Sequence, residues 1–481
     1  MFKNQYLISD KKSLCVCNQY FTWNGLHVHL GESTDYALNK KCLLIGKAAH
    51  SLDPKKRVKD IVSDIDNLST YDDIIKYIDD IAGRYIILFE IDNDVICITD
   101  ACAFKRGLFI KYKDWKILTS SEKFAAYLMQ FEIEVKADVN KLIDDSYFQR
   151  RESPWFGLVS YDERFKFIIP NHCLYWNSFQ TQRLPVPNIT EKNRTELAAF
   201  MLKNTLEGLA AQYKLIQPIT AGIDSRILLA ASEKVKDEIN YYVFSRESND
   251  EDTRIARQLS LINNNSLAVV QASNINNNHK FIELLQSNVI KPRILPKTAN
   301  IFYHLNHTPP NSVNINGNGS EVCRLVYGSA PFQLTPKQLA IIQGVDNWSL
   351  LSEKINDWFV TTDVLEYAKK NDLSISDLFY WEQRMPLWGA TYPLEQDIAI
   401  DEVSPFSNRK LIYTLLREPV GMRKRPQNRA SKEIISYLNP LLNSLPFNPD
   451  SYGSKVGRLR IYIKRNPVSI LLARKLMKIF K

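Results

Sequence analysis

A short run of small and hydroxyl-bearing residues, Thr220-Ala-Gly-Ile-Asp-Ser225, has the residue types and spacing of a phosphate site. It follows an apolar stretch, Tyr213–Ile219, that predicts a buried strand, and it leads into Ser225–Ser232, which predicts a helix. Such a turn gathers backbone N–H groups and the positive end of a helix dipole at one point. We therefore expect phosphate binding at this loop, and a small turn capped by Asp224 is the alternative.

The side chains of the loop extend this expectation. Thr220 and Ser225 add hydroxyl donors, and the small residues between them let a phosphate approach the backbone. Asp224 places a carboxylate beside the phosphates, which is repulsive unless a cation lies between them. Asp224 therefore predicts a Mg²⁺ ligand.

The elements that must hold this loop alternate between strand and helix. A helix is expected over Glu191–Gln212, a second strand over Asn240–Phe244, an acidic helix start near Asp250, and a third strand over Leu267–Gln271. This alternation is typical of an α/β domain with a mainly parallel sheet. We assign residues 188–457 to that domain.

The loop resembles the PP-loop of the asparagine synthetase family, whose pattern is Ser-Gly-Gly-x-Asp-Ser. Gly222, Asp224 and Ser225 match the pattern, while Thr220 and Ala221 replace its Ser and first Gly. The resemblance implies an ATP site with Mg²⁺ on Asp224. It also implies nucleotide contacts from Thr220, Ala221, Gly222, Asp224, Ser225 and Phe244.

Two later segments resemble further landmarks of that family, in the family's order. Gly317-Asn-Gly319-Ser-Glu321 resembles the second phosphate and metal loop, although one acidic position is missing. This implies nucleotide contacts at Gly317 and Gly319 and a second metal ligand at Glu321. The family's catalytic acid falls on Asp401, with Glu402 beside it as a rival.

Three basic residues are further candidates. Lys455 lies in a segment that resembles the late lysine-bearing loop of β-lactam synthetase, which implies a catalytic contact with the phosphates; the alternative is that it only begins a basic tail. Lys432 is a second catalytic candidate. Arg226 follows the loop and is expected either to hold a phosphate or carboxylate or to pack on the helix face.

Residues 1–187 read as a sheet-rich domain with its linker. Alternating apolar residues from Gly83, followed by Asn93-Asp94 and Val95–Thr99, predict a hairpin, and Gly107–Thr119 predicts another. The motifs Gly83-Arg-Tyr and Asp100-Ala-Cys-Ala-Phe-Lys-Arg-Gly107 resemble the Ntn-type class II glutaminase domain of the same family. The expected fold class is therefore an Ntn-type sheet-rich domain followed by a parallel-sheet PP-loop domain.

The glutaminase resemblance is incomplete. That family exposes a cysteine at residue 2 as nucleophile, and this chain has Phe2 there. Cys15 or Cys17 could serve only after removal of a propeptide. The chain is thus similar to β-lactam synthetase-type members that lack the cysteine, and we expect a degenerate domain without glutaminase activity.

The formal net charge of +9 is concentrated at the C-terminal end of the chain. Nine basic residues and no acidic one follow Asp450, so the remainder is formally neutral and nucleic acid is not an expected partner. Residues 458–481 predict a basic amphipathic tail. Two roles stay open for it: contact with an anionic membrane surface, or docking of its apolar face on the body.

Composition points to a cytoplasmic protein. No stretch reaches the roughly 20 apolar residues needed to cross a bilayer, the first residues lack the apolar run of a secretory signal, and the seven scattered cysteines read as reduced thiols. If the tail binds membrane, the protein would lie at the inner membrane face. A homodimer is one expected assembly.

These patterns together predict an AMP-forming, ATP-dependent ligase. It would adenylate a carboxylate on a small molecule, glycan or peptide and join it to an amine or ammonia, in polysaccharide or specialised-metabolite biosynthesis. Amidation of a uronic acid on a lipid-linked glycan precursor would suit a membrane-bound tail. The alternative is a catalytically silent relative that binds nucleotide as a scaffold or regulator.

Overall fold

The computed structural model describes residues 2–13, 15, 17, 19–246, 250–273, 278–330, 332–447 and 466–479.

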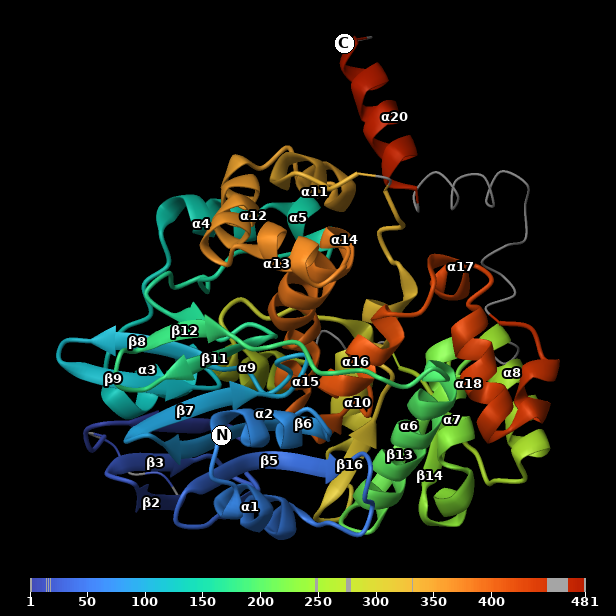
Figure 1. Cartoon of the computed structure of the whole chain (residues 1–481), viewed down its shortest axis with the longest axis horizontal. Helices are drawn as coiled ribbons and strands as arrows, with labels where there is room; N and C mark the ends of the chain where they lie inside the picture. Colours follow the sequence, from blue (N-terminus) through green and yellow to red (C-terminus); the bar gives the residue numbers. More distant parts are fainter. Residues whose placement is uncertain are drawn as a thin grey trace.

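The C-terminal half is built on a five-stranded sheet in which every neighbouring pair is parallel. Its spatial order is β15 (Ala268–Gln271), β14 (Asn240–Ser245), β13 (Lys214–Pro218), β16 (Ser312–Ile315) and β17 (Asp401–Val403). The helices that follow these strands cover both faces, as the crossovers between parallel strands require (Figure 1). The helices between the first four strands are α7 (Ile223–Ala231), α8 (Glu251–Asn263), α9 (His279–Asn288) and α10 (Pro296–Leu305).

The sequence predictions for this half agree with the structure up to β15. The predicted helix before the loop is α6 (Arg194–Ala210), and the two predicted strands after the loop are β14 and β15. Neither β16 nor β17 was predicted as a strand. The helices after β16 are α11 (Pro336–Gln343), α12 (Ser349–Thr361), α13 (Val364–Lys370), α14 (Ile375–Phe379), the π-helical segment Tyr380–Gly389, α15 (Thr391–Gln396), α16 (Arg409–Leu416), α17 (Val420–Arg423) and α18 (Arg429–Leu438).

The N-terminal half is a sandwich of two six-stranded sheets, antiparallel throughout. The first sheet has the order β10 (Lys166–Phe167), β8 (Leu108–Tyr112), β9 (Trp115–Thr119), β1 (Tyr6–Ser9), β3 (Leu26–Leu30), β2 (Gln19–Trp23). The second has the order β12 (Gln180–Arg183), β11 (His172–Tyr175), β7 (Asp94–Thr99), β6 (Ile81–Ile91), β5 (Cys42–His50), β4 (Tyr36–Leu38). Both predicted hairpins are present, as β6–β7 and β8–β9.

Helices cover the outer faces of this sandwich. One apolar cluster fills the space between the two sheets. Another lies between the second sheet and helices α1 (Val58–Asn67) and α2 (Tyr71–Ile78), while α3 (Glu122–Met129) packs on the first sheet. The layers are therefore helix, sheet, sheet and helix, and the expected fold class, an Ntn-type domain followed by a parallel-sheet domain, is confirmed.

The two halves share one apolar core. The cluster that includes Phe124 of α3 and Phe156 continues without a break into Ile227 of α7 and Val313 of β16. The proposed boundary at 187/188 falls between β12 and α6 and stays a prediction. Burial on this scale makes the two halves a single packed body rather than two loosely linked ones.

The tail helix α20 (Pro467–Ile479) projects from the body beside α11 (Figure 1). Leu471 packs against the main core, and the Arg474 guanidinium lies 2.9 Å from the carboxylate of Asp346. These contacts are those of a helix docked on the body, while membrane binding stays a prediction. Among the described residues, no helix has both the length and the apolar character needed to span a membrane.

Candidate functional site

The two predicted phosphate loops follow adjacent strands, β13 and β16. From β13 the chain crosses to β14 on one side, and from β16 it crosses to β17 on the other. The strand order reverses there, and open α/β sheets bind ligands outside the carboxyl ends of their strands at this switch point. We refer to residues 219–225 and 316–321 as the switch-point loops.

The first switch-point loop is closed by its own hydroxyl groups. The hydroxyls of Thr220 and Ser225 lie 2.9 Å apart, and the Gly222 N–H donates to Thr220 Oγ1 at 3.2 Å. Gly222 caps α7 without any side-chain acceptor, so the positive end of this helix is open to an anion. Asp224 lies inside the helix and does not cap it, which removes that part of the alternative interpretation.

One N–H group of this loop already holds an anion. The Ala221 N–H donates to the carboxylate of Asp252, on the first turn of α8, at 2.8 Å. The acidic helix start noted in the sequence therefore reaches the loop. This contact shows that the Ala221 N–H can donate a hydrogen bond to a carboxylate oxygen in the folded chain.

The second switch-point loop is locked to the first through Asp224. Ser320 Oγ donates to Asp224 Oδ1 at 2.5 Å. A Cβ on Gly317 would lie 2.7 Å from the Cβ of Asp224, closer than real side chains approach, so this position requires glycine. Gly319 has φ +92°, and its N–H donates to Glu321 Oε2 at 3.1 Å. The structure thus brings Asp224, Gly317, Gly319 and Glu321 together, as the resemblance implied.

The predicted metal ligands do not fit a divalent ion in this arrangement. The Arg324 guanidinium lies 2.8 Å from Asp224 Oδ2 and 3.8 Å from Glu321 Oε1, so it occupies the position between the two carboxylates. No cluster of three metal-ligating side chains exists among the described residues. Burial, and then the charge of Asp224, raise the pKa of the Glu321 carboxyl, which further disfavours a free anionic ligand.

A second guanidinium, that of Arg425, interacts electrostatically with the same carboxylates. Burial, and then the charge of Arg324, lower the pKa of Arg425 to about 10, while Asp224 and Glu321 oppose this shift. Neither Arg324 nor Arg425 was found from the sequence. The only signal for Arg324 was its position three residues after Glu321, the spacing at which side chains meet on a helical turn.

The two acidic candidates on β17 point to different places. Asp401 pairs in register with Val313, before the carboxyl end of the sheet, and its carboxylate lies 2.9 Å from Arg84 and 3.7 Å from Lys47 of the N-terminal half. Burial raises the pKa of the Asp401 carboxyl, but the positive charges of Arg84, Lys47 and Lys105 lower it by more, so the pKa is lowered overall. Asp401 is thus not brought to the switch-point loops.

Glu402 faces the second switch-point loop. Its Oε1 accepts from the side-chain amide of Asn318 at 3.3 Å, and its Oε2 accepts from Asn314 at 3.5 Å. Glu402 is buried, and burial raises the pKa of its carboxyl. Of the two rivals, Glu402 is therefore the one that contacts the loop and has the more basic carboxylate.

Arg84 is the centre of a buried charge cluster between the two halves. It forms two hydrogen bonds with Asp397, at 2.6 and 2.7 Å, besides its pair with Asp401. Burial raises the pKa of Asp397 to about 6 and lowers that of the nearby Lys105 to about 8. No pattern in the sequence predicts this cluster, because Arg84 and Asp397 are 313 residues apart.

Arg226 has a structural position. Its guanidinium is fully buried, donates to the carbonyl oxygens of Leu445 and Pro446 at 2.6 and 2.8 Å, and lies 3.9 Å from the centre of the Phe447 ring. It therefore packs and holds the segment before residue 448, which is the second of the two expected roles.

The remaining candidates lie at the edge of this region. Lys432 is exposed on α18, with its ammonium 5.5 Å from the centre of the Phe447 ring. Phe244, on β14, is half-buried against Tyr242 and His304, with ring centres 5.2 and 5.7 Å away. Lys455 lies outside the described residues. The catalytic and nucleotide-binding roles of these residues stay predictions.

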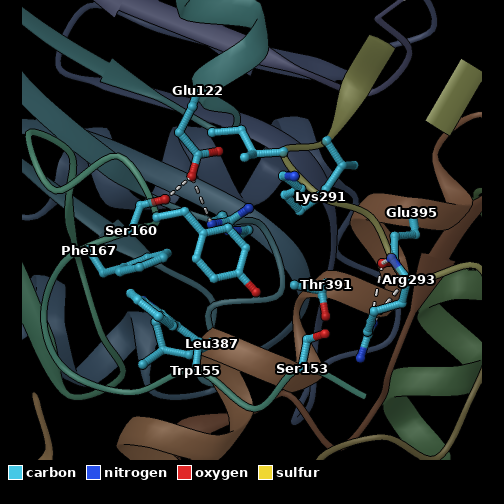
Figure 2. A pocket seen from close by; sticks show the side chains of 14 residues that line it. Glu122, Ser153, Trp155, Ser160, Phe167, Lys291, Arg293, Leu387, Thr391 and Glu395 are labelled. Atoms are coloured by element: carbon cyan, nitrogen blue, oxygen red, sulfur yellow. Dashed lines mark hydrogen bonds and ion pairs between the residues drawn. The ribbon is translucent and has the colours of Figure 1, made fainter. Parts of the chain in front are cut away.

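A cavity of about 30 Å³, lined by both apolar and charged side chains, lies elsewhere, between the two halves (Figure 2). Glu122 accepts from Ser160 and from Arg106, and Arg293 pairs with Glu395 at 2.9 Å. One water molecule needs roughly 10–15 Å³ of such space, so this cavity suits a few waters.

Residue 2 and two of the cysteines in the N-terminal half bear on the expected loss of the glutaminase nucleophile. Phe2 packs against Phe124 and Tyr127, with ring centres 5.1 and 5.4 Å away. Burial raises the pKa of Cys17 and of Cys102, which favours the unreactive thiol form. All seven cysteines of the chain are free.

Comparisons with known proteins add little to this geometry. No family model and no curated protein matches the chain. The NH3-dependent NAD synthetase from Campylobacter jejuni is similar over 41% of this chain and 94% of its own, with 16% identity and a TM-score of 0.22. The glutamine phosphoribosylpyrophosphate amidotransferase from B. subtilis is similar over 67% of this chain and 71% of its own, with 8% identity and a TM-score of 0.21. We infer no activity from either likeness.

Proposed function

We propose that the chain is an ATP-dependent carbon–nitrogen ligase that works without a glutaminase of its own. The observation that carries the proposal is the meeting of two small-residue loops at the switch point, interlocked by the Ser320–Asp224 hydrogen bond and by the close approach of Gly317. The uncapped N-terminus of α7, the loop amides and the guanidinium group of Arg324 at the switch point are suited to bind a polyphosphate. Phe2, which stands where the glutaminase family has its cysteine and packs against Phe124, supports an external amine or ammonia as nitrogen source.

The proposed reaction has two steps. A substrate carboxylate attacks the α-phosphorus of ATP, which gives an acyl-adenylate and releases pyrophosphate. An amine then attacks the acyl carbon, which forms the amide and releases AMP, and the proton lost by the nitrogen goes to a general base. Holding both reactants in place can supply roughly 7–11 kcal/mol of the barrier reduction.

We assign the base to Glu402 in preference to Asp401. The raised pKa of Glu402 and its contact with Asn318 support this choice, because a base needs both proximity and proton affinity. Asp401 has its carboxylate committed to Arg84. The nucleotide contacts proposed for Thr220 and Ser225 rest on their place in the first switch-point loop, and the contact proposed for Phe244 rests on the family resemblance alone.

The test separates the two steps. Isotope exchange between pyrophosphate and ATP reports adenylation, and amide formation from pools of carboxylates and amines reports the whole reaction. Glu402→Gln is expected to retain exchange and lose amide formation, while Asp224→Ala loses both. Asp401→Asn is the matched control, and loss of amide formation in that variant with retention in Glu402→Gln would reverse the assignment.

A catalytically silent nucleotide-binding protein is the second candidate. The carboxylate of Asp252 on the Ala221 amide and the guanidinium of Arg324 on Asp224 favour it, since both groups that an active loop would offer are already engaged. This candidate predicts nucleotide binding with no pyrophosphate release for any carboxylate and amine tested.

A further inference from the structure

Arg324 stands in direct contact with both acidic residues of the switch point. It follows the second loop, in the short helix Ser320–Arg324, and its guanidinium is about nine-tenths buried. One terminal nitrogen serves both Asp224 and Glu321, whereas Nε is buried with no hydrogen-bond partner among the described residues. A guanidinium has five N–H donors, so donors remain for a further anion.

The four carboxylate oxygens of Asp224 and Glu321 each face a donor or a cation. Asp224 Oδ1 accepts from Ser320, and Oδ2 faces Arg324. Glu321 Oε2 accepts from the Gly319 N–H, and Oε1 faces Arg324. The carboxylates are satisfied without a metal, because hydrogen bonds and the two ion pairs with Arg324 face their oxygens.

Arg425 adds a second positive charge to this group. It is half-buried, its Nε also has no partner among the described residues, and it interacts electrostatically with both carboxylates. Guanidinium groups bind phosphate through paired N–H donors and keep their charge, so Arg324 is suited to bind a phosphate at the position expected for a divalent ion.

We propose that Arg324 neutralises phosphate charge at the switch point, in place of a divalent cation held by Asp224 and Glu321. The inference rests on the phosphate-binding part of the proposed function and deepens it. It makes Arg324 a binding residue for a polyphosphate, and it gives Asp224 and Glu321 the task of orienting that guanidinium.

The test measures binding of pyrophosphate and of a non-hydrolysable ATP analogue by titration calorimetry, with excess Mg²⁺ and with excess EDTA. For the wild-type chain we expect dissociation constants that differ by less than about threefold between the two conditions. Arg324→Gln should weaken binding in EDTA by about tenfold or more, since it removes charged hydrogen bonds. Mg²⁺ should then restore part of the affinity in this variant alone, because the freed carboxylates can hold it.

Controls and contrary outcomes are defined by the same titrations. Arg150→Gln, at an exposed position on α5 (Ser146–Arg150), makes the same charge change away from the loops and should bind like wild type. Arg324→Lys keeps the charge and serves if Arg324→Gln does not fold, as judged by its thermal midpoint; it should weaken binding less. Wild-type binding that falls more than about tenfold in EDTA overturns the inference, as does unchanged binding by both Arg324 variants.

The proposed function can fail separately. If pyrophosphate binds with the expected dependence on Arg324 and the ATP analogue does not bind, the inference stands and the choice of ATP is wrong. If neither probe binds under any condition, both the inference and the proposed function are wrong.

Discussion

Replacing Arg84 by methionine should weaken the junction between the two halves of the molecule. Arg84 is only 3% exposed and makes three short contacts, at 2.6, 2.7 and 2.9 Å, with the carboxylates of Asp397 and Asp401. Removing one partner of a buried ion pair typically costs about 3–5 kcal/mol, because a charge is left without compensation. Lys47, 3.7 Å from Asp401, offsets only part of that loss. We therefore expect a loss of about 3–5 kcal/mol in the free energy of unfolding at pH 7.5.

The loss of stability in Arg84→Met should depend on pH. In the wild-type chain the pKa of Asp397 is raised to about 6, so the stability it contributes is present below its unfolded value and is lost as the pH rises through about 6. Asp401, with its lowered pKa, contributes stability that is lost on acidification. Without Arg84 both carboxylates should bind protons more tightly when folded. The deficit of Arg84→Met should therefore be smaller at pH 5.5 than at pH 7.5.

Urea unfolding followed by tryptophan fluorescence measures this effect at both pH values. Arg150→Met, an exposed change, is the control, and Asp397→Asn added to Arg84→Met should recover part of the loss. The reasoning is refuted if Arg84→Met loses no more stability than Arg150→Met at pH 7.5. It is also refuted if the deficit is the same at both pH values and is unaffected by Asp397→Asn.

Two further predictions concern the switch-point loops. Gly317→Ala should lower the free energy of unfolding by about 1–3 kcal/mol and weaken pyrophosphate binding, because its Cβ would lie 2.7 Å from the Cβ of Asp224. Thermal melting and calorimetry measure the two effects. Gly421→Ala, where nothing lies within 4 Å of the added Cβ, is the control, and equal effects in the two variants would contradict the prediction. Asp252→Asn should tighten pyrophosphate binding by about threefold to tenfold in calorimetry, because it removes an anion that competes for the Ala221 N–H with the free energy of about one hydrogen bond. Glu251→Gln, on the same turn of α8, should have little effect. Weaker binding by Asp252→Asn would contradict the prediction and show that the carboxylate assists the ligand.

The strand, loop and helix around Thr220–Ser225 could be predicted because local signals agree. An apolar run gives β13, small residues give the turn, and an apolar face gives α7. The hairpin between β6 and β7 was also local, although its turn lies at Asp92 and Asn93, which both adopt positive φ, one residue before the predicted Asn93-Asp94. In each case residues within a few positions of one another determine the structure.

The strands β16 and β17 were missed for physical reasons. They have only four and three residues, and they place polar side chains, Asn314 and Glu402, in buried positions. Their partners are other strands far along the chain, so no alternation of apolar residues marks them. Without those strands it could not be inferred which way the side chains of Asp401 and Glu402 point. The motif alone favoured Asp401, whose carboxylate faces the N-terminal half.

The contacts of Arg324 were hidden for a related reason. Short-range spacing places it beside Glu321, but its closer partner, Asp224, lies 100 residues earlier and on another strand–helix unit. A motif names the acidic residues that can hold a metal. It does not say which basic side chain the fold will bring between them.

The buried pairing of Arg84 with Asp397 and Asp401 bears on how this chain can be shortened or rearranged. A fragment starting at residue 188 would carry both carboxylates and neither Arg84 nor Lys47, so it would retain two acids whose counter-ions were encoded upstream. The N-terminal half therefore supplies the positive charges that these two acids need when they are buried, whatever its own chemistry. A separate polypeptide of residues 1–187, supplied in trans, should rescue such a fragment only if it retains Arg84.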